Sequence, residues 1–165
     1  MFHGKMPAVI QMKKYFETTE FPTDAKLQAL LQKQRAPLAA AAMQETLREL
    51  TWYLSGPVRF LLAAFPKADK LDQETIQAAN IDRVDIMCAS DDERYLPVFT
   101  DLAGLKKFKP VLREGEIIYL AGKQDLLDFL HANDKVAACV VNPDKDDLLL
   151  YRMHLQNMIK VEQER

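Results

Sequence analysis

Cysteine and histidine are both scarce in this chain, which has two cysteines and three histidines among 165 residues. Cys88 and Cys139 lie far apart, each in an apolar run, so we expect two reduced, buried thiols with a structural role rather than a disulfide framework. The histidines are widely separated, and no cluster of ligand-type residues with metal-binding spacing surrounds them. The sequence therefore predicts no metal site and no cofactor.

Glycine and serine are also few, with five glycines and two serines. This excludes a glycine-rich phosphate loop and a Gly-x-Ser-x-Gly nucleophile elbow. Asp144, Asp146 and Asp147 have the alternating carboxylates of a calcium loop, but no glutamate follows at the twelfth position and no glycine makes the central bend. A solvated turn explains them better. Enzymatic activity is therefore the less favoured reading, and no catalytic residue is assigned.

No charge of one sign dominates, and no apolar run is long. The formal net charge is −2, with 28% charged and 48% hydrophobic residues, which argues against a nucleic-acid-binding protein. The longest apolar run, residues 60–65, is far shorter than the roughly 18 residues that a membrane span needs. Lys13 and Lys14 stand where a secretory signal would be apolar. We expect a cytoplasmic protein that binds neither nucleic acid nor membrane.

The first third of the chain has helical spacing. Residues 1–22 are expected to form an N-terminal arm, either frayed or a helix docked on the domain, because Val9, Met12 and Phe16 have helical spacing between two prolines. Residues 23–165 are expected to form one domain. Thr23-Asp24 opens a leucine-striped helix that ends near residue 35, and Pro37 opens a second, alanine-rich helix that ends at Ser55-Gly56-Pro57. Short connections of this kind predict an antiparallel helical hairpin.

From residue 58 the pattern changes to short apolar runs separated by polar turns. Strands are predicted at 58–65, 84–89, 95–99, 116–120, 136–141 and 148–151, and helices at 102–108, at 123–132 and from residue 153. The first strands are consecutive, whereas the later ones alternate with helices. This mixture predicts an α+β fold, in which a mixed β-sheet is covered by helices and preceded by the helical hairpin.

The stretch from Arg94 to Phe108 runs from an apolar strand directly into a short helix. Pro97 lacks the amide that a central strand donates, so it predicts an edge position, a strand start or a bulge. Thr100 or Asp101 can cap the following helix. Lys106 and Lys107, with Lys109 and Arg113, form a small basic patch that an exposed helix face explains, and that remains a possible contact surface for an acidic partner.

Two segments carry a resemblance to a known family. The run 95–101, Tyr-Leu-Pro-Val-Phe-Thr-Asp, and the run 140–144, Val-Val-Asn-Pro-Asp, flank a leucine-rich helix. In this order they resemble the SseB N-terminal domain family over roughly residues 24–160. The resemblance implies a bacterial cytosolic α/β domain with no established catalytic residues and no settled molecular function. The second, C-terminal domain of longer family members is not expected here.

Two functions from different classes fit these observations. The first is a non-catalytic protein-interaction or accessory module, which uses the Pro97 strand edge, the Lys106-Lys107 helix face or the helical hairpin. The second is a small-molecule-binding enzyme or sensor with a polar cleft at strand ends, where Thr100, Asp101 and Asn142 are the candidates. A capping role for Thr100 or Asp101 and a turn at Asn142 explain those residues more simply. A third possibility is that the chain is a structural domain that self-associates.

Overall fold

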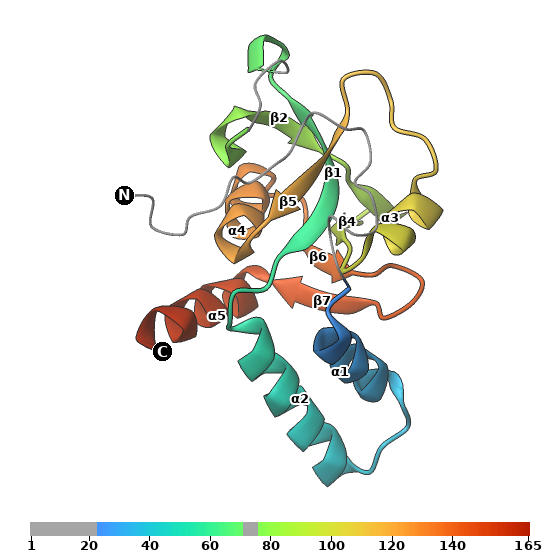
Figure 1. The fold of residues 1–165 in the computed structure, drawn as a ribbon, viewed down its shortest axis with the longest axis vertical. Coiled ribbons are helices and arrows are strands. Elements are labelled where there is room, and N and C mark those ends of the chain that lie inside the picture. Colours follow the sequence, from blue (N-terminus) through green and yellow to red (C-terminus); the bar gives the residue numbers. More distant parts are fainter. Residues whose placement is uncertain (1–22, 71–75) are drawn as a thin grey trace.

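The computed structural model describes residues 23–70 and 76–165, so the expected arm at 1–22 lies outside the described residues. The predicted helical hairpin is confirmed by α1 (Ala25–Arg35) and α2 (Ala40–Leu54), which pack against each other (Figure 1). Asp24 begins α1, because its side chain accepts a hydrogen bond from the Leu27 amide at 3.1 Å. The hydroxyl of Tyr53 on α2 donates to the same carboxylate at 2.6 Å, which joins the two helices.

Three antiparallel strands form one sheet in the order β2-β1-β5. These strands are β1 (Phe60–Pro66), β2 (Ile81–Val84) and β5 (Ile117–Ala121). All seven residues of β1 are buried, as expected for a strand flanked on both sides and covered on both faces. Short 3-10 turns at Ala68–Lys70 and Ala78–Asn80 lie between β1 and β2.

A second, four-stranded sheet has the order β3-β4-β6-β7. Its strands are β3 (Met87–Ser90), β4 (Glu93–Val98), β6 (Ala138–Val141) and β7 (Leu148–Tyr151). β4 and β6 are parallel, and the outer pairs are antiparallel. The two sheets meet where Leu61 and Phe99 exchange backbone hydrogen bonds of 2.8 Å. The α+β class is confirmed, with the described strands divided between two joined sheets.

The strand predicted at 84–89 is wrong, because the chain changes sheets within it. β2 ends at Val84 and β3 begins at Met87, so Asp85 and Ile86 form the crossing. The residues on either side of Asp85 are both apolar, so the sequence shows no local sign that the chain changes sheets there. β3 and β4 form an antiparallel hairpin, with Met87 opposite Tyr95.

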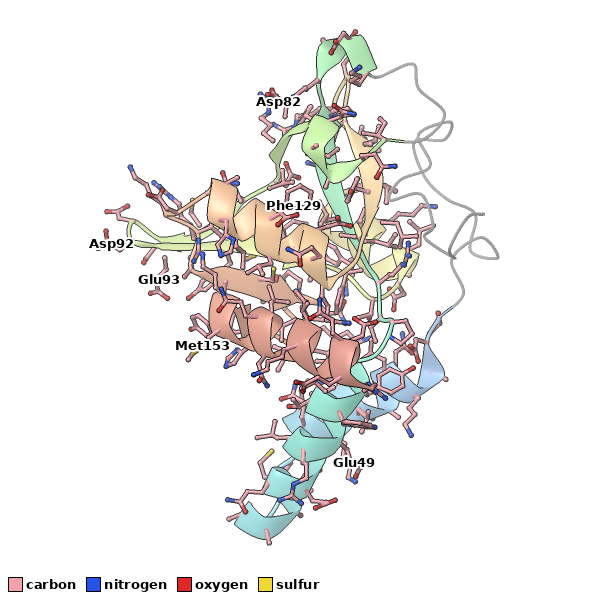
Figure 2. The ribbon with its side chains drawn as sticks, turned by 90° about the vertical axis from the view of Figure 1, so that its left-hand side faces the viewer. Glu49, Asp82, Asp92, Glu93, Phe129 and Met153 are labelled. Carbon is pink, nitrogen blue, oxygen red and sulfur yellow. The ribbon has the colours of Figure 1, made fainter. Side chains whose placement is uncertain are left out.

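Helices α3 (Leu102–Phe108), α4 (Lys123–Ala132) and α5 (Arg152–Glu164) complete the described part of the fold. α4 and α5 pack together and cover the same side of the sheets (Figures 1 and 2). Buried Lys123 holds this region together, since its ammonium contacts the Gly56 carbonyl and lies 2.8 Å from Glu162 of α5. Within the described residues, no helix is long and apolar enough to span a bilayer.

The two cysteines differ in their surroundings. Cys139 on β6 is fully buried, and burial raises its pKa to about 12. Cys88 is exposed on β3, which is an edge strand. The expectation of two buried thiols is therefore wrong for Cys88, because residues 88–90 are exposed on both faces of β3.

Candidate binding pocket

Asn142 and Thr100 come together where the two parallel strands end. Asn142 is the first residue after β6 and Thr100 is the second residue after β4, and parallel strands place their carboxyl ends at the same edge. The Asn142 side-chain oxygen accepts from the Thr100 amide at 3.0 Å, and its NH₂ group donates to the Thr100 hydroxyl at 2.9 Å. Both residues are buried. They therefore satisfy each other and fix the two strand ends together.

The Asn142 side chain also connects to the helical hairpin through Asp146. Its NH₂ group donates to Asp146 Oδ2 at 2.7 Å. Arg35 Nε of α1 lies 2.7 Å from Asp146 Oδ1, at ion-pair distance but without hydrogen-bond geometry, and Gln34 donates to the Asp146 carbonyl. Asn142 has a φ of 51°, so the expected turn is confirmed with a left-handed residue at its start.

Asp101 caps α3, as one of the two predicted candidates. Its Oδ1 accepts from the Gly104 amide at 2.6 Å, and its Oδ2 accepts from the Gln28 side chain of α1 at 2.8 Å. A Cβ at Gly104 would lie 3.0 Å from Asp101 Oδ1 and 3.7 Å from the Phe99 ring. Glycine at 104 therefore leaves room for the cap and the ring beneath it.

A pocket of about 450 Å³ opens between α3 and the turn that follows β6. In Figure 1 these two segments lie on the same side of the four-stranded sheet. The pocket's wall contains two aromatic rings, two lysines and two aspartates: it is formed by Phe99, Asp101, Ala103, Gly104, Lys107, Phe108, Asn142, Pro143, Asp144 and Lys145. The rings of Phe99 and Phe108 are 5.4 Å apart and tilted, so they form a continuous apolar floor.

Some of the charged groups at this pocket have hydrogen-bond partners within the described part of the protein, and others do not. Both Asp101 oxygens are hydrogen-bonded within the protein. Lys107 and Lys145 are exposed, and neither ammonium has a partner among the residues that the structure describes. Asp144 is exposed at the same rim. The pocket thus offers an apolar floor with two available cations, one from each wall.

Pro97 lies neither in an edge strand nor at the start of a strand, so both of these expectations are wrong. β4 lies between β3 and β6, and Pro97 is buried opposite Val140. The carbonyls of Arg94 and Val98 accept from residues 137 and 142, so Pro97 faces away from β6. On that side the β3 ladder ends at Tyr95 and the Leu61 bridge begins at Phe99. Pro97 occupies the gap between them, where no partner for an amide is required.

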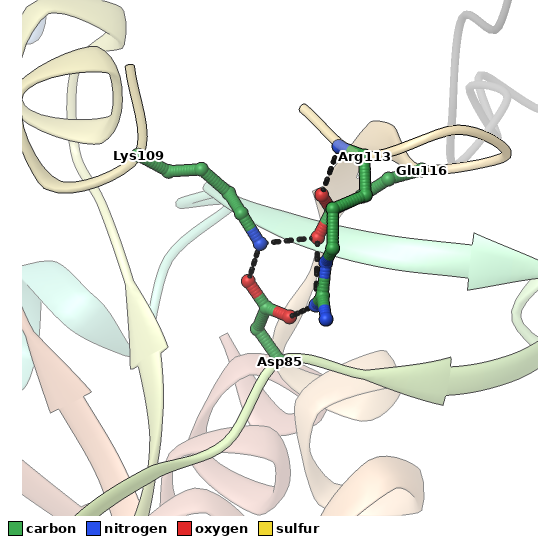
Figure 3. A network of polar contacts seen from close by, with 4 residues as sticks. All are labelled: Asp85, Lys109, Arg113 and Glu116. Atoms are coloured by element: carbon green, nitrogen blue, oxygen red, sulfur yellow. Dashed lines mark hydrogen bonds and ion pairs between the residues drawn. The ribbon is translucent and has the colours of Figure 1, made fainter. Parts of the chain in front are cut away.

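The residues of the basic patch proposed around α3 lie in two different environments (Figure 3). Lys109 contacts Asp85 and lies 2.5 Å from Glu116 Oε2, while Arg113 reaches Asp85 Oδ1 at 2.8 Å. The Arg113 amide donates to Glu116 Oε1 at 2.8 Å. Lys109 and Arg113 are therefore part of an ion network, while Lys107 lines the pocket and Lys106 is exposed next to it.

Because of this network, the stability of the fold depends on pH. Burial raises the pKa of Glu116, but the hydrogen bonds from Lys109 and the Arg113 amide and the two positive charges outweigh it, so the pKa lies below its ordinary value of 4.5. A lowered pKa stabilises the fold above pH 4.5 and loses this contribution as pH falls toward the folded-state pKa. We expect the free energy of unfolding to drop below pH 4.5 less steeply in Glu116→Gln than in the wild type. Urea titrations at several pH values measure both slopes, and equal slopes would exclude Glu116 as the cause.

No family model, no curated protein and no solved structure matches this chain. The described residues also contain no group of three or more His, Cys, Asp or Glu side chains placed to hold a metal ion. Thr100, Asp101, Lys107 and Asn142 were candidates from the sequence alone, whereas Phe108 was not, because an apolar residue at helical spacing indicates a core position as readily as a pocket floor. Lys145 carried no signal of its own.

Proposed function

We propose that this chain is a non-catalytic protein-interaction or accessory module of the bacterial cytosol, and that the pocket between α3 and the turn after β6 is its binding site. The observation that carries this proposal is the state of the pocket's polar groups. Asn142 and Asp101 already form hydrogen bonds inside the protein, and Thr100 behind them does the same. The features still available to a ligand are apolar surface and charged side chains, which are typical of a binding site.

The composition of the pocket specifies the partner chemistry. The Phe99 and Phe108 floor accepts an aromatic or large apolar side chain. Lys107 and Lys145 can each pair with a carboxylate next to that side chain. Asp144 at the rim repels a run of several acids. The expected ligand is therefore an exposed peptide segment in which one acidic residue neighbours an apolar one.

A peptide-library selection tests this proposal. We expect the wild type to enrich peptides that carry an aromatic or leucine side chain beside a single aspartate or glutamate. Ala103 is exposed in the pocket wall, so Ala103→Trp should fill the pocket and weaken binding of the selected peptides at least about tenfold, which is roughly 1.4 kcal/mol.

Ala132→Trp is the matched control, because Ala132 is exposed at the end of α4 and is not part of the pocket. It should bind the peptides as the wild type does. Selection of no consensus, or equal binding by Ala103→Trp, would contradict the proposal.

A second candidate function is a small-molecule sensor or enzyme at the same pocket. The observation that favours it is that Asp101 and Asn142 both line the pocket, with Thr100 hydrogen-bonded to Asn142. A volume of about 450 Å³ also lies within the range of small-ligand sites. Native mass spectrometry of the purified protein distinguishes the two functions. A bound small molecule that Ala103→Trp excludes would favour the sensor, whereas protein without such a molecule would leave the peptide site as the better account.

A further inference from the structure

Helix α2 extends away from both sheets and leaves most of its surface uncovered. It packs against α1 and, near its C-terminal end, against α5 (Figures 1 and 2). Only Thr46, Leu50 and Leu54 of its 15 residues are buried. Trp52 and Leu47 are exposed to 56% and 42%, and the two side chains line the same groove. This face borders an open groove that reaches Val161 of α5.

Four exposed residues of α2 form one stripe along the helix. Ala41, Glu45, Arg48 and Trp52 follow each other at intervals of four, three and four residues, so they lie one above the other on one side. From the N-terminal to the C-terminal end of the helix, the stripe consists of a small, an acidic, a basic and a large side chain. In an antiparallel copy the order is reversed, so that the large side chain meets the small one and the basic side chain meets the acidic one.

We infer that this stripe is the interface of a homodimer in which the α2 helices of two copies pack antiparallel. A two-fold axis between Glu45 and Arg48 places each Trp52 over Ala41 of the other copy and each Arg48 opposite the other Glu45. Such an interface is isologous, because the same patch serves both copies. The inference concerns a surface separate from the pocket and does not depend on the proposed function.

The local geometry supports each of these contacts. Arg165 lies 3.9 Å over one face of the Trp52 ring and donates to the Trp52 carbonyl at 3.0 Å, so the ring is held in place while more than half of the residue stays exposed. Arg48 and Glu45 pair within the helix at 2.6 Å, with exposures of 72% and 58%. In the dimer each group keeps an opposite charge beside it.

The extent of the stripe limits the affinity. A 15-residue helix is about 22 Å long, and one face of it buries less than the roughly 800 Å² per partner of a standard stable interface. Leu47 and the α5 wall of the groove add apolar surface. We therefore expect a monomer–dimer equilibrium with a dissociation constant of about 10 to 100 μM.

Charge reversal with mixing tests the inference by sedimentation equilibrium. Glu45→Arg makes the stripe carry two cations, and Arg48→Glu makes it carry two anions, so each variant alone should raise the dissociation constant at least about tenfold. An equimolar mixture restores both cross-pairs between copies while the repulsion within each helix persists. The mixture should therefore associate about as tightly as the wild type.

Asp128→Arg is the control, because Asp128 is exposed on α4 and not on α2; it should leave the equilibrium unchanged. Circular dichroism checks that each variant keeps its helices, which exposed positions allow. A wild type that stays monomeric up to about 1 mM, variants that dimerise as the wild type does, or a mixture no tighter than its components would each overturn the inference.

Discussion

Replacing Lys109 with methionine should lower the free energy of unfolding by about 3 to 5 kcal/mol, because it leaves buried carboxylate charge without its main partner. The side chain of Glu116 is fully buried, and Lys109 is the cation that lies closest to both Glu116 and Asp85. Arg113 cannot replace it fully, because its guanidinium is 63% exposed and lies 3.6 Å from Glu116. Urea denaturation monitored by circular dichroism measures the loss.

Two further variants separate this charge effect from a loss of packing. Lys107→Met changes an exposed lysine on the same helix and should stay within about 0.5 kcal/mol of the wild type. The double variant Lys109→Met, Glu116→Gln removes the buried charge as well and should recover part of the lost stability. A Lys109→Met protein as stable as the wild type would show that the network contributes no net free energy.

Replacing Asn142 with alanine should cost about 3 kcal/mol, since it removes the hydrogen bonds to the buried Thr100 amide and to Asp146 Oδ2 and places alanine in a left-handed conformation. Asn142 makes three hydrogen bonds of 2.7 to 3.0 Å with these two residues. Its φ of 51° is a conformation that asparagine and glycine adopt more readily than alanine. Chemical denaturation of the variant measures the cost.

The backbone and hydrogen-bond contributions can be measured apart. Asn142→Gly accepts the positive φ but loses the same hydrogen bonds, so it should be about 1 kcal/mol more stable than Asn142→Ala. Asn157→Ala, at an exposed position of α5, should change stability by less than about 0.5 kcal/mol. If Asn142→Ala matched Asn157→Ala, the strand ends would be held by other contacts.

Local patterns predict local structure well in this chain. The helix from Lys123 to Ala132 and the strand from Leu148 to Tyr151 have the predicted bounds, because apolar spacing and turn residues decide such elements. The cap at Asp101 and the turn at Asn142 follow from side-chain chemistry that acts over three or four residues.

Long-range arrangement is what the sequence did not predict. The change of sheets at Asp85 and the interior position of Pro97 depend on which strands become neighbours. Lys109 was grouped with exposed lysines because its partners Asp85 and Glu116 are distant in the chain or lie across a loop. The pocket likewise joins residues about 40 positions apart, and no local spacing in the sequence predicts that these residues lie close together.

We propose that the pocket between α3 and the turn after β6 binds a peptide from a partner. An NMR titration of the full chain with the tightest peptide from the library selection tests this, because it follows every backbone amide at once. We expect saturable shifts centred on residues 99–108 and 142–145, which disappear in Ala103→Trp. Shifts centred elsewhere, or shifts at the pocket that persist in Ala103→Trp, would contradict it.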